Sequence, residues 1–158
     1  MADTTVPAAA PAPAAPDVKP VQTPLTLIMT LKSKQAFADL NATLQKYNAL
    51  PASQNPIMQA MDAVGTVHFA RFVFLDNNTK LAVITTFDHD LETYLEDFCA
   101  KIGPVFDILD QHMVDGPPAP VQQHPQEFLA YVQKHNVPTV GFYSAYPTKT
   151  VLDIRNAD

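Results

Sequence analysis

Residues 66–87 read TVHFARFVFLDNNTKLAVITTF, and this stretch decides the fold. Its two halves are rich in β-branched and aromatic residues, which favour strands. Between them stands Asp76-Asn77-Asn78-Thr79, and Asp and Asn accept the left-handed backbone conformations that a tight reversal needs. The stretch therefore predicts a β-hairpin made of strands 66–75 and 81–87.

Strands are also predicted on either side of this hairpin. Residues 25–31 alternate with a period of two. One face of this strand is strongly apolar and consists of Leu25, Leu27, Met29 and Leu31, and the other consists of Thr26, Ile28 and Thr30. Near the end of the chain, residues 139–146 read as a last strand that Pro147 ends.

Helical spacing separates these strands. Ser33 predicts the start of a helix that carries Phe37 and Leu40, and Asn55-Pro56 predicts the start of a shorter one that Gly65 ends. The clearest amphipathic stripe runs from Leu91 to Ile102, with Asp88 or Asp90 as its cap and Gly103-Pro104 as its expected end. A further helical turn is expected within 105–113 and another helix over 125–136.

Without the extra helices, the order is β-α-β-β-α-β. This order predicts an α+β domain of ferredoxin-like topology, with a four-stranded antiparallel sheet and helices on one face. We expect the domain to span residues 25–158. Residues 1–24 contain seven Ala and six Pro and no aromatic residue, so we expect a disordered Ala/Pro-rich arm.

Composition narrows the expected partners. The net charge is −6 and the ten Lys and Arg residues are scattered singly, so neither a nucleic-acid partner nor a membrane surface is expected. The sequence contains no signal-peptide pattern and no apolar run long enough to span a bilayer, which predicts a cytoplasmic protein. Cys99, the single cysteine, lies on an apolar helical stripe and is expected to be an inert core thiol.

The first strand of the hairpin, 66–75, is apolar on both predicted faces. Phe69 and Val73 share one face with Arg71, and Phe72 and Phe74 share the other with His68. A sheet covered by helices on one face usually shows polar residues on the other. We therefore expect another surface to cover the second face, most simply a second copy of the chain in a homodimer.

The residues from Val64 to Leu75 and from Thr86 to Phe98, joined by the hairpin turn, resemble the dimeric α+β barrel superfamily. The resemblance covers roughly residues 25–105 and 139–147. It implies that two ferredoxin-like sheets pair into a barrel. The superfamily includes haem enzymes such as chlorite dismutases and dye-decolorising peroxidases, haem-degrading monooxygenases, cofactor-free monooxygenases and small-molecule isomerases, so haem is a possible cofactor.

Four residues are candidates for a site. His68 is a candidate general base and Arg71 a candidate clamp for a carboxylate or a haem propionate, and the alternatives are a core histidine and an interface ion pair. His112 is a candidate axial haem ligand and Tyr143 a candidate pocket residue, with a surface histidine and a packed aromatic as the alternatives. No histidine pair has the spacing of a zinc site, so no metal site is predicted.

Two functions follow from these observations. One is a small-molecule-binding α+β barrel protein, with or without oxidoreductase chemistry on a small hydrophobic substrate. The other is a non-catalytic binding or interaction module with its N-terminal arm as a flexible tether. The sequence leaves open whether the chain is an enzyme.

Overall fold

The computed structural model describes residues 18–157 of the chain. Its strands are β1 (Gln22–Thr30), β2 (Val67–Leu75) and β3 (Lys80–Asp88). Its α-helices are α1 (Lys34–Asn48), α2 (Pro56–Val64), α3 (Leu95–Asp110), α4 (Pro125–His135) and α5 (Val151–Arg155). Two 3-10 helices, η1 (Ala52–Gln54) and η2 (Val121–Gln123), complete the regular structure. The predicted α+β class is confirmed.

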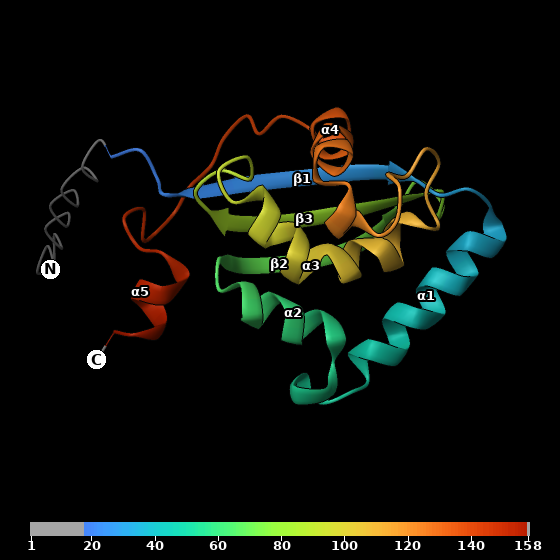
Figure 1. Cartoon of the computed structure of the whole chain (residues 1–158), viewed down its shortest axis with the longest axis horizontal. Helices are drawn as coiled ribbons and strands as arrows, with labels where there is room; N and C mark the ends of the chain where they lie inside the picture. Colours follow the sequence, from blue (N-terminus) through green and yellow to red (C-terminus); the bar gives the residue numbers. More distant parts are fainter. Residues whose placement is uncertain (1–17, 158) are drawn as a thin grey trace, which may run out of the picture.

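The three strands form one antiparallel sheet in the order β1-β3-β2 (Figure 1). The predicted hairpin is confirmed as β2 and β3, with Leu75 opposite Lys80 at its closed end. Asp76, Asn77 and Asn78 all have φ between 53° and 63°, the left-handed conformation expected from these residue types. β1 pairs with β3 from Gln22 opposite Asp88 to Thr30 opposite Lys80.

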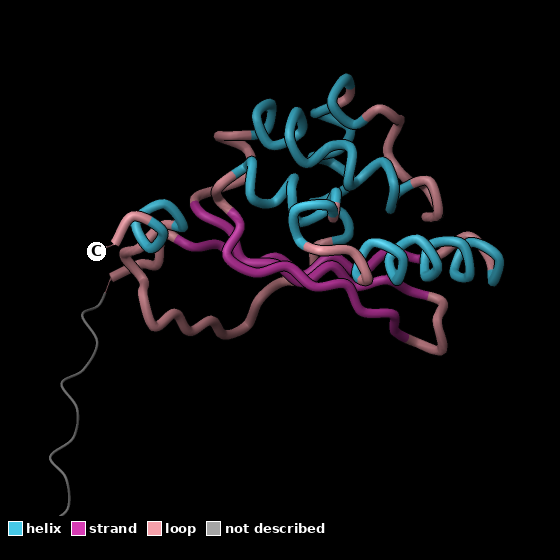
Figure 2. Tube along the Cα trace, turned by 90° about the horizontal axis from the view of Figure 1, so that it is seen from below, coloured by secondary structure: helices cyan, strands magenta, loops and turns pink. Residues whose placement is uncertain are grey.

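Most of the helices lie on one side of the sheet and leave the other side bare of helices (Figure 2). The core forms between this helical layer and the inner face of the sheet. Its fully buried side chains come from every layer: Leu27, Met29, Leu40, Leu81, Ile102, Leu109, Met113, Val121, Phe128 and Cys99. Cys99 is thus a core residue, as predicted, and burial raises the pKa of its thiol to about 11.

The helix starts predicted from Ser33 and Asn55 are confirmed. The Ser33 hydroxyl accepts a hydrogen bond from the Ala36 N–H at 3.0 Å, and the Asn55 side chain accepts from Ile57 N–H at 2.9 Å. Gly65 ends α2 with φ of 66°, a conformation that favours glycine. These caps fix where α1 begins and where α2 begins and ends.

The prediction that Gly103-Pro104 ends the long helix is wrong. α3 runs through Pro104 and ends at Asp110, so the two predicted helical pieces are one element. Its start is also later than predicted: His89 has φ of 63°, and Asp90 accepts a hydrogen bond from Thr93 N–H in a separate turn. The apolar residues on both sides of Pro104 share the core, and this packing outweighs the one backbone hydrogen bond that proline removes.

The predicted fourth strand at 139–146 is not a strand. The segment does run beside β1, since Val137 N–H donates to Thr26 O and Val21 N–H donates to Pro147 O, both at 2.8 Å. Between these two contacts it has ten residue steps against five in β1. The surplus chain cannot stay in a ladder with β1 and forms an irregular loop, which we call the 137–147 loop.

The predicted faces of β2 are also corrected at one end. A bulge places both Val67 and Phe69 opposite consecutive residues of β3, so the alternation slips at His68. Val67 therefore shares the helix-covered face with Phe72 and Phe74, while Phe69, Arg71 and Val73 lie on the bare face.

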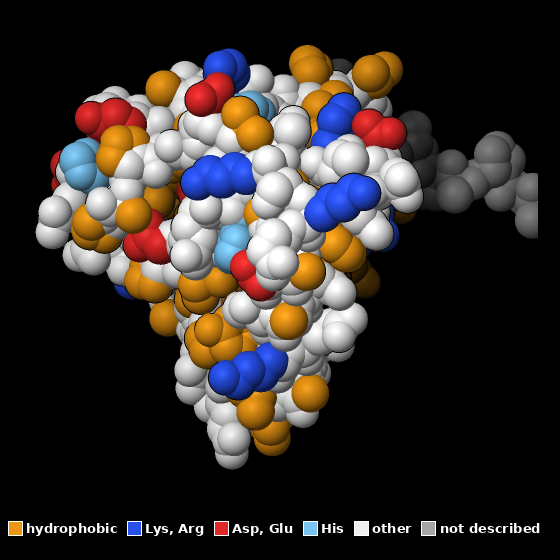
Figure 3. All heavy atoms as spheres, turned by 90° about the vertical axis from the view of Figure 1, so that its right-hand side faces the viewer, with side chains coloured by type: hydrophobic (Ala, Val, Ile, Leu, Met, Phe, Trp, Pro, Cys, Tyr) orange, Lys and Arg blue, Asp and Glu red, His pale blue; other side chains and the backbone are white. Residues whose placement is uncertain are grey.

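The predicted arm, residues 1–24, lies outside the described residues as far as residue 17. β1 begins at Gln22, three residues earlier than the predicted start of the domain. Within residues 18–157 no helix combines the length and the apolar character that crossing a membrane requires. On the face shown in Figure 3, the Lys and Arg side chains are separated by neutral and acidic ones.

Candidate functional site

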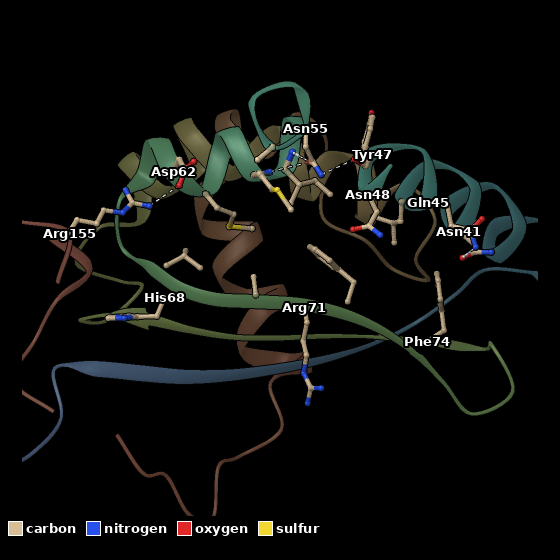
Figure 4. Close-up of a pocket in the computed structure, with 18 residues that line it drawn as sticks. Asn41, Gln45, Tyr47, Asn48, Asn55, Asp62, His68, Arg71, Phe74 and Arg155 are labelled. Carbon is tan, nitrogen blue, oxygen red and sulfur yellow. Dashed lines mark hydrogen bonds and ion pairs between the residues drawn. The ribbon is translucent and has the colours of Figure 1, made fainter. Parts of the chain in front are cut away.

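A groove of about 680 Å³ lies between α1, α2 and the outer edge of β2 (Figure 4). β2 is an edge strand, because only β3 pairs with it. α1 leaves the sheet at an angle, with Phe37 packed edge-to-face on Phe74 at 4.7 Å between ring centroids. The space left between the diverging helices and the strand is the groove.

The groove has an apolar floor. Phe72 and Phe74 reach it from β2, Ile57 and Met61 from α2, and Leu44 from α1. Such a surface favours the apolar body of a ligand, because each contact removes apolar area from water.

Amide side chains form the α1 wall of the groove. Asn41, Gln45 and Asn48 follow one another at helical spacing and lie together on the side of α1 that faces the groove (Figure 4). Amides both donate and accept hydrogen bonds. This wall can therefore orient a polar edge of a ligand without supplying a charge.

An ion pair closes one end of the groove. Arg155 of α5 donates from Nη2 to Asp62 Oδ1 of α2 at 2.7 Å. The two charges that line this end of the groove are thus engaged with each other. They leave no free charge there to select an ionic ligand.

His68, a predicted catalytic residue, lines the same end of the groove. Its Nε2 lies 2.7 Å from Asp88 Oδ1, and both side chains are nearly buried. The other oxygen of Asp88 accepts a hydrogen bond from Val151 N–H at 2.8 Å. Asp88 thereby joins β2, β3 and the start of α5, and His68 serves to hold this junction together.

Arg71, the second predicted catalytic residue, does not join His68. Its guanidinium points to the opposite side of β2, away from the groove (Figure 4). It stands opposite Ile84 on the bare face of the sheet. The separation follows the alternation predicted from the sequence, in which positions 68 and 71 lie on opposite faces of the strand.

The two predicted cofactor residues lie elsewhere. His112 follows α3 at the end of β1, where its carbonyl accepts from Lys32 N–H at 3.0 Å, and burial lowers the pKa of its imidazole. That end of the sheet is the one far from His68. Tyr143 is 84% exposed in the 137–147 loop.

These positions do not fit a haem. Of the four predicted residues, His68 and Arg71 line the groove, but His68 is bound to Asp88 and the guanidinium of Arg71 points away from the groove. His112 and Tyr143 do not line the groove. We therefore derive no haem chemistry for this chain. Within residues 18–157 there is also no group of three His, Cys, Asp or Glu side chains placed to hold a metal ion.

Two features were not predicted from the sequence: the amide wall of the groove, and the buried carboxyl of Asp110, which lies outside the groove. The amide wall left a signal, because Asn41, Gln45 and Asn48 recur at helical spacing on the side of a helix next to its apolar stripe. The sequence signal of the buried Asp110 carboxyl was weaker: it was only an acidic residue at the C-terminal end of an amphipathic helix.

Comparison of the chain with protein-family models, with curated proteins and with solved structures finds no match.

Proposed function

We propose that this chain is a small-molecule-binding protein whose ligand occupies the groove between α1, α2 and β2. The observation that carries the proposal is the combination of an apolar floor with an amide wall in a groove of about 680 Å³. This volume is in the range of ligand pockets.

The charges predict the class of ligand. Asp62 and Arg155 neutralise each other, and the guanidinium of Arg71 points away. A ligand with a net charge would find no partner for it, whereas a neutral molecule with an apolar body and a hydroxyl or carbonyl edge would pair with the amides. The geometry supports binding better than catalysis, because His68 is committed to the Asp88 junction.

The methionines offer a direct test. Met58 and Met61 line the groove, while Met29 and Met113 are fully buried in the core. With methyl-labelled methionine and 2-naphthol as a neutral aromatic probe, we expect saturable NMR shifts of the first two methyl signals and none of the last two. Met58→Glu should weaken binding by about tenfold, since a charge in the groove must be desolvated.

Leu152→Glu is the matched control, because Leu152 is exposed on α5 and does not line the groove. It should leave the affinity for 2-naphthol unchanged. Shifts that do not saturate, or equal weakening by both variants, would contradict the proposed site.

A second proposal concerns the bare face of the sheet, which we infer packs on a second copy of the chain. Phe69 is 77% exposed there, beside Val73 and Leu75. The adjoining 137–147 loop exposes Val140, Tyr143 and Tyr146. Apolar exposure on this scale is typical of an interaction surface, and a symmetric dimer would supply the pairing that the α+β barrel requires.

Sedimentation equilibrium tests the dimer. We expect the native chain to show twice its mass of 17.3 kDa, and Phe69→Glu to show the mass of one chain while its circular dichroism stays native. Tyr94→Glu, at an exposed position just before α3, should remain a dimer. A native chain that sediments at 17.3 kDa at every concentration would rule the dimer out.

A further inference from the structure

The carboxyl of Asp110 is the most unusual polar group in the described part of the chain. The residue is 4% exposed, and neither side-chain oxygen has a hydrogen-bond partner among residues 18–157. Buried polar side chains in proteins are nearly always hydrogen-bonded, because losing water without a replacement costs free energy. We therefore expect a hydrogen-bond donor from outside the described residues to bind this carboxyl.

The surroundings of Asp110 strengthen the need for a cation. Asp110 is the last residue of α3, the negative end of the helix dipole, and that last turn contains no basic residue. Burial and then the charge of Asp107 raise the pKa of Asp110 to about 8. The Tyr131 hydroxyl of α4 is also buried without a partner in the described residues, and burial and then Asp110 raise its pKa.

Asp110 also belongs to the lining of a separate cavity of about 290 Å³. Asp107, Asp110 and Asp115 line it together with Lys32 and Gly116. Lys32 does not serve Asp110, since its Nζ donates to the Gln111 carbonyl at 3.0 Å. Gly116 is required by the packing, because a Cβ there would lie 2.5 Å from the Asp110 carbonyl oxygen. The loop after α3 can thus fold closely over the helix end.

We propose that this cavity binds a small organic cation through a primary ammonium group, which donates hydrogen bonds to the Asp110 carboxylate. The carboxylates of Asp107 and Asp115 add a favourable field. A primary ammonium fits better than a metal ion. No three acidic or His side chains in residues 18–157 are placed around one metal position, whereas an ammonium needs only one carboxylate partner and supplies three donors.

Methylammonium chloride is the probe, with ¹³C-labelled aspartate carboxyls read by NMR in phosphate buffer. The Asp110 signal, identified by its loss in Asp110→Asn, should shift saturably with methylammonium and its apparent pKa should fall. Tetramethylammonium has the same charge but no N–H donor and should not produce the shift. Asp110→Asn should weaken binding, followed by the rise in melting temperature, by more than about tenfold.

Asp97→Asn is the matched control, because Asp97 lies on the same helix but is exposed and paired with Lys101. This variant should bind methylammonium as the native chain does. Equal responses to methylammonium, tetramethylammonium and sodium would overturn the proposal. So would a larger response to calcium than to methylammonium at equal concentration, or unchanged binding by Asp110→Asn.

Discussion

Phe128→Ala is expected to lower the free energy of unfolding by about 3–5 kcal/mol, the range for large aromatic truncations in a core. Phe128 is fully buried on α4, with its ring centroid 4.8 Å from Phe106 and 6.2 Å from Phe98. Both of these partners belong to α3. The truncation removes the contacts that join α4 to α3 and leaves a cavity that rigid neighbours cannot fill.

Urea unfolding followed by circular dichroism measures this loss. Phe142→Ala makes the same chemical change at a half-exposed position in the 137–147 loop and should cost much less. A loss below about 1 kcal/mol for Phe128→Ala would mean that α4 does not pack as described. An equal loss for both variants would mean that burial does not set the cost.

The elements with strong local signals could be predicted from the sequence. The hairpin had alternating strands joined by four turn residues, and α1 and α2 had caps at Ser33 and Asn55. In each case the hydrophobic pattern and the local chemistry favour the same structure. Tertiary contacts therefore did not have to change the structure that the local sequence favours.

The errors arose where tertiary context decides. Pro104 ends a helix by local rules, but the apolar residues of α3 continue beyond it into the same core. The segment 139–146 has strand-like composition, but it has too many residues to match its neighbour β1. The bulge at His68 is a third case, since no residue type in 66–69 predicts that the pairing register between β2 and β3 changes there.

The candidate site was predictable only in part. His68 does line the groove, but the sequence could not show that Asp88 holds it, because the pair lies 20 residues apart. The groove itself depends on the angle at which α1 leaves the sheet, which helical periodicity does not determine. Likewise Asp110 looks like an ordinary polar position of its helix until the loop at Gly116 covers it.

The second large effect is expected from Asp110→Asn, as a change in how stability depends on pH. The pKa of Asp110 is raised from 3.8 to about 8 in the folded chain. Between these two values the folded chain binds more protons than the unfolded one, so the free energy of unfolding falls as pH rises. The shift corresponds to on the order of 5 kcal/mol, which is present below pH 4 and lost by about pH 8.

Asparagine has nearly the same shape and never ionises, so Asp110→Asn should not show this loss. We expect the variant and the native chain to have similar stability near pH 4, and the variant to be several kcal/mol more stable at pH 8.5. Urea unfolding across this range, in amine-free buffer so that no ammonium occupies the cavity, measures the difference. Asp97→Asn, at an exposed carboxylate of the same helix, should follow the native chain at every pH. Parallel curves for the native chain and Asp110→Asn would mean that the Asp110 carboxyl has a donor or reaches water at high pH. In that case the buried charge cannot be what makes the end of α3 a site for a cation.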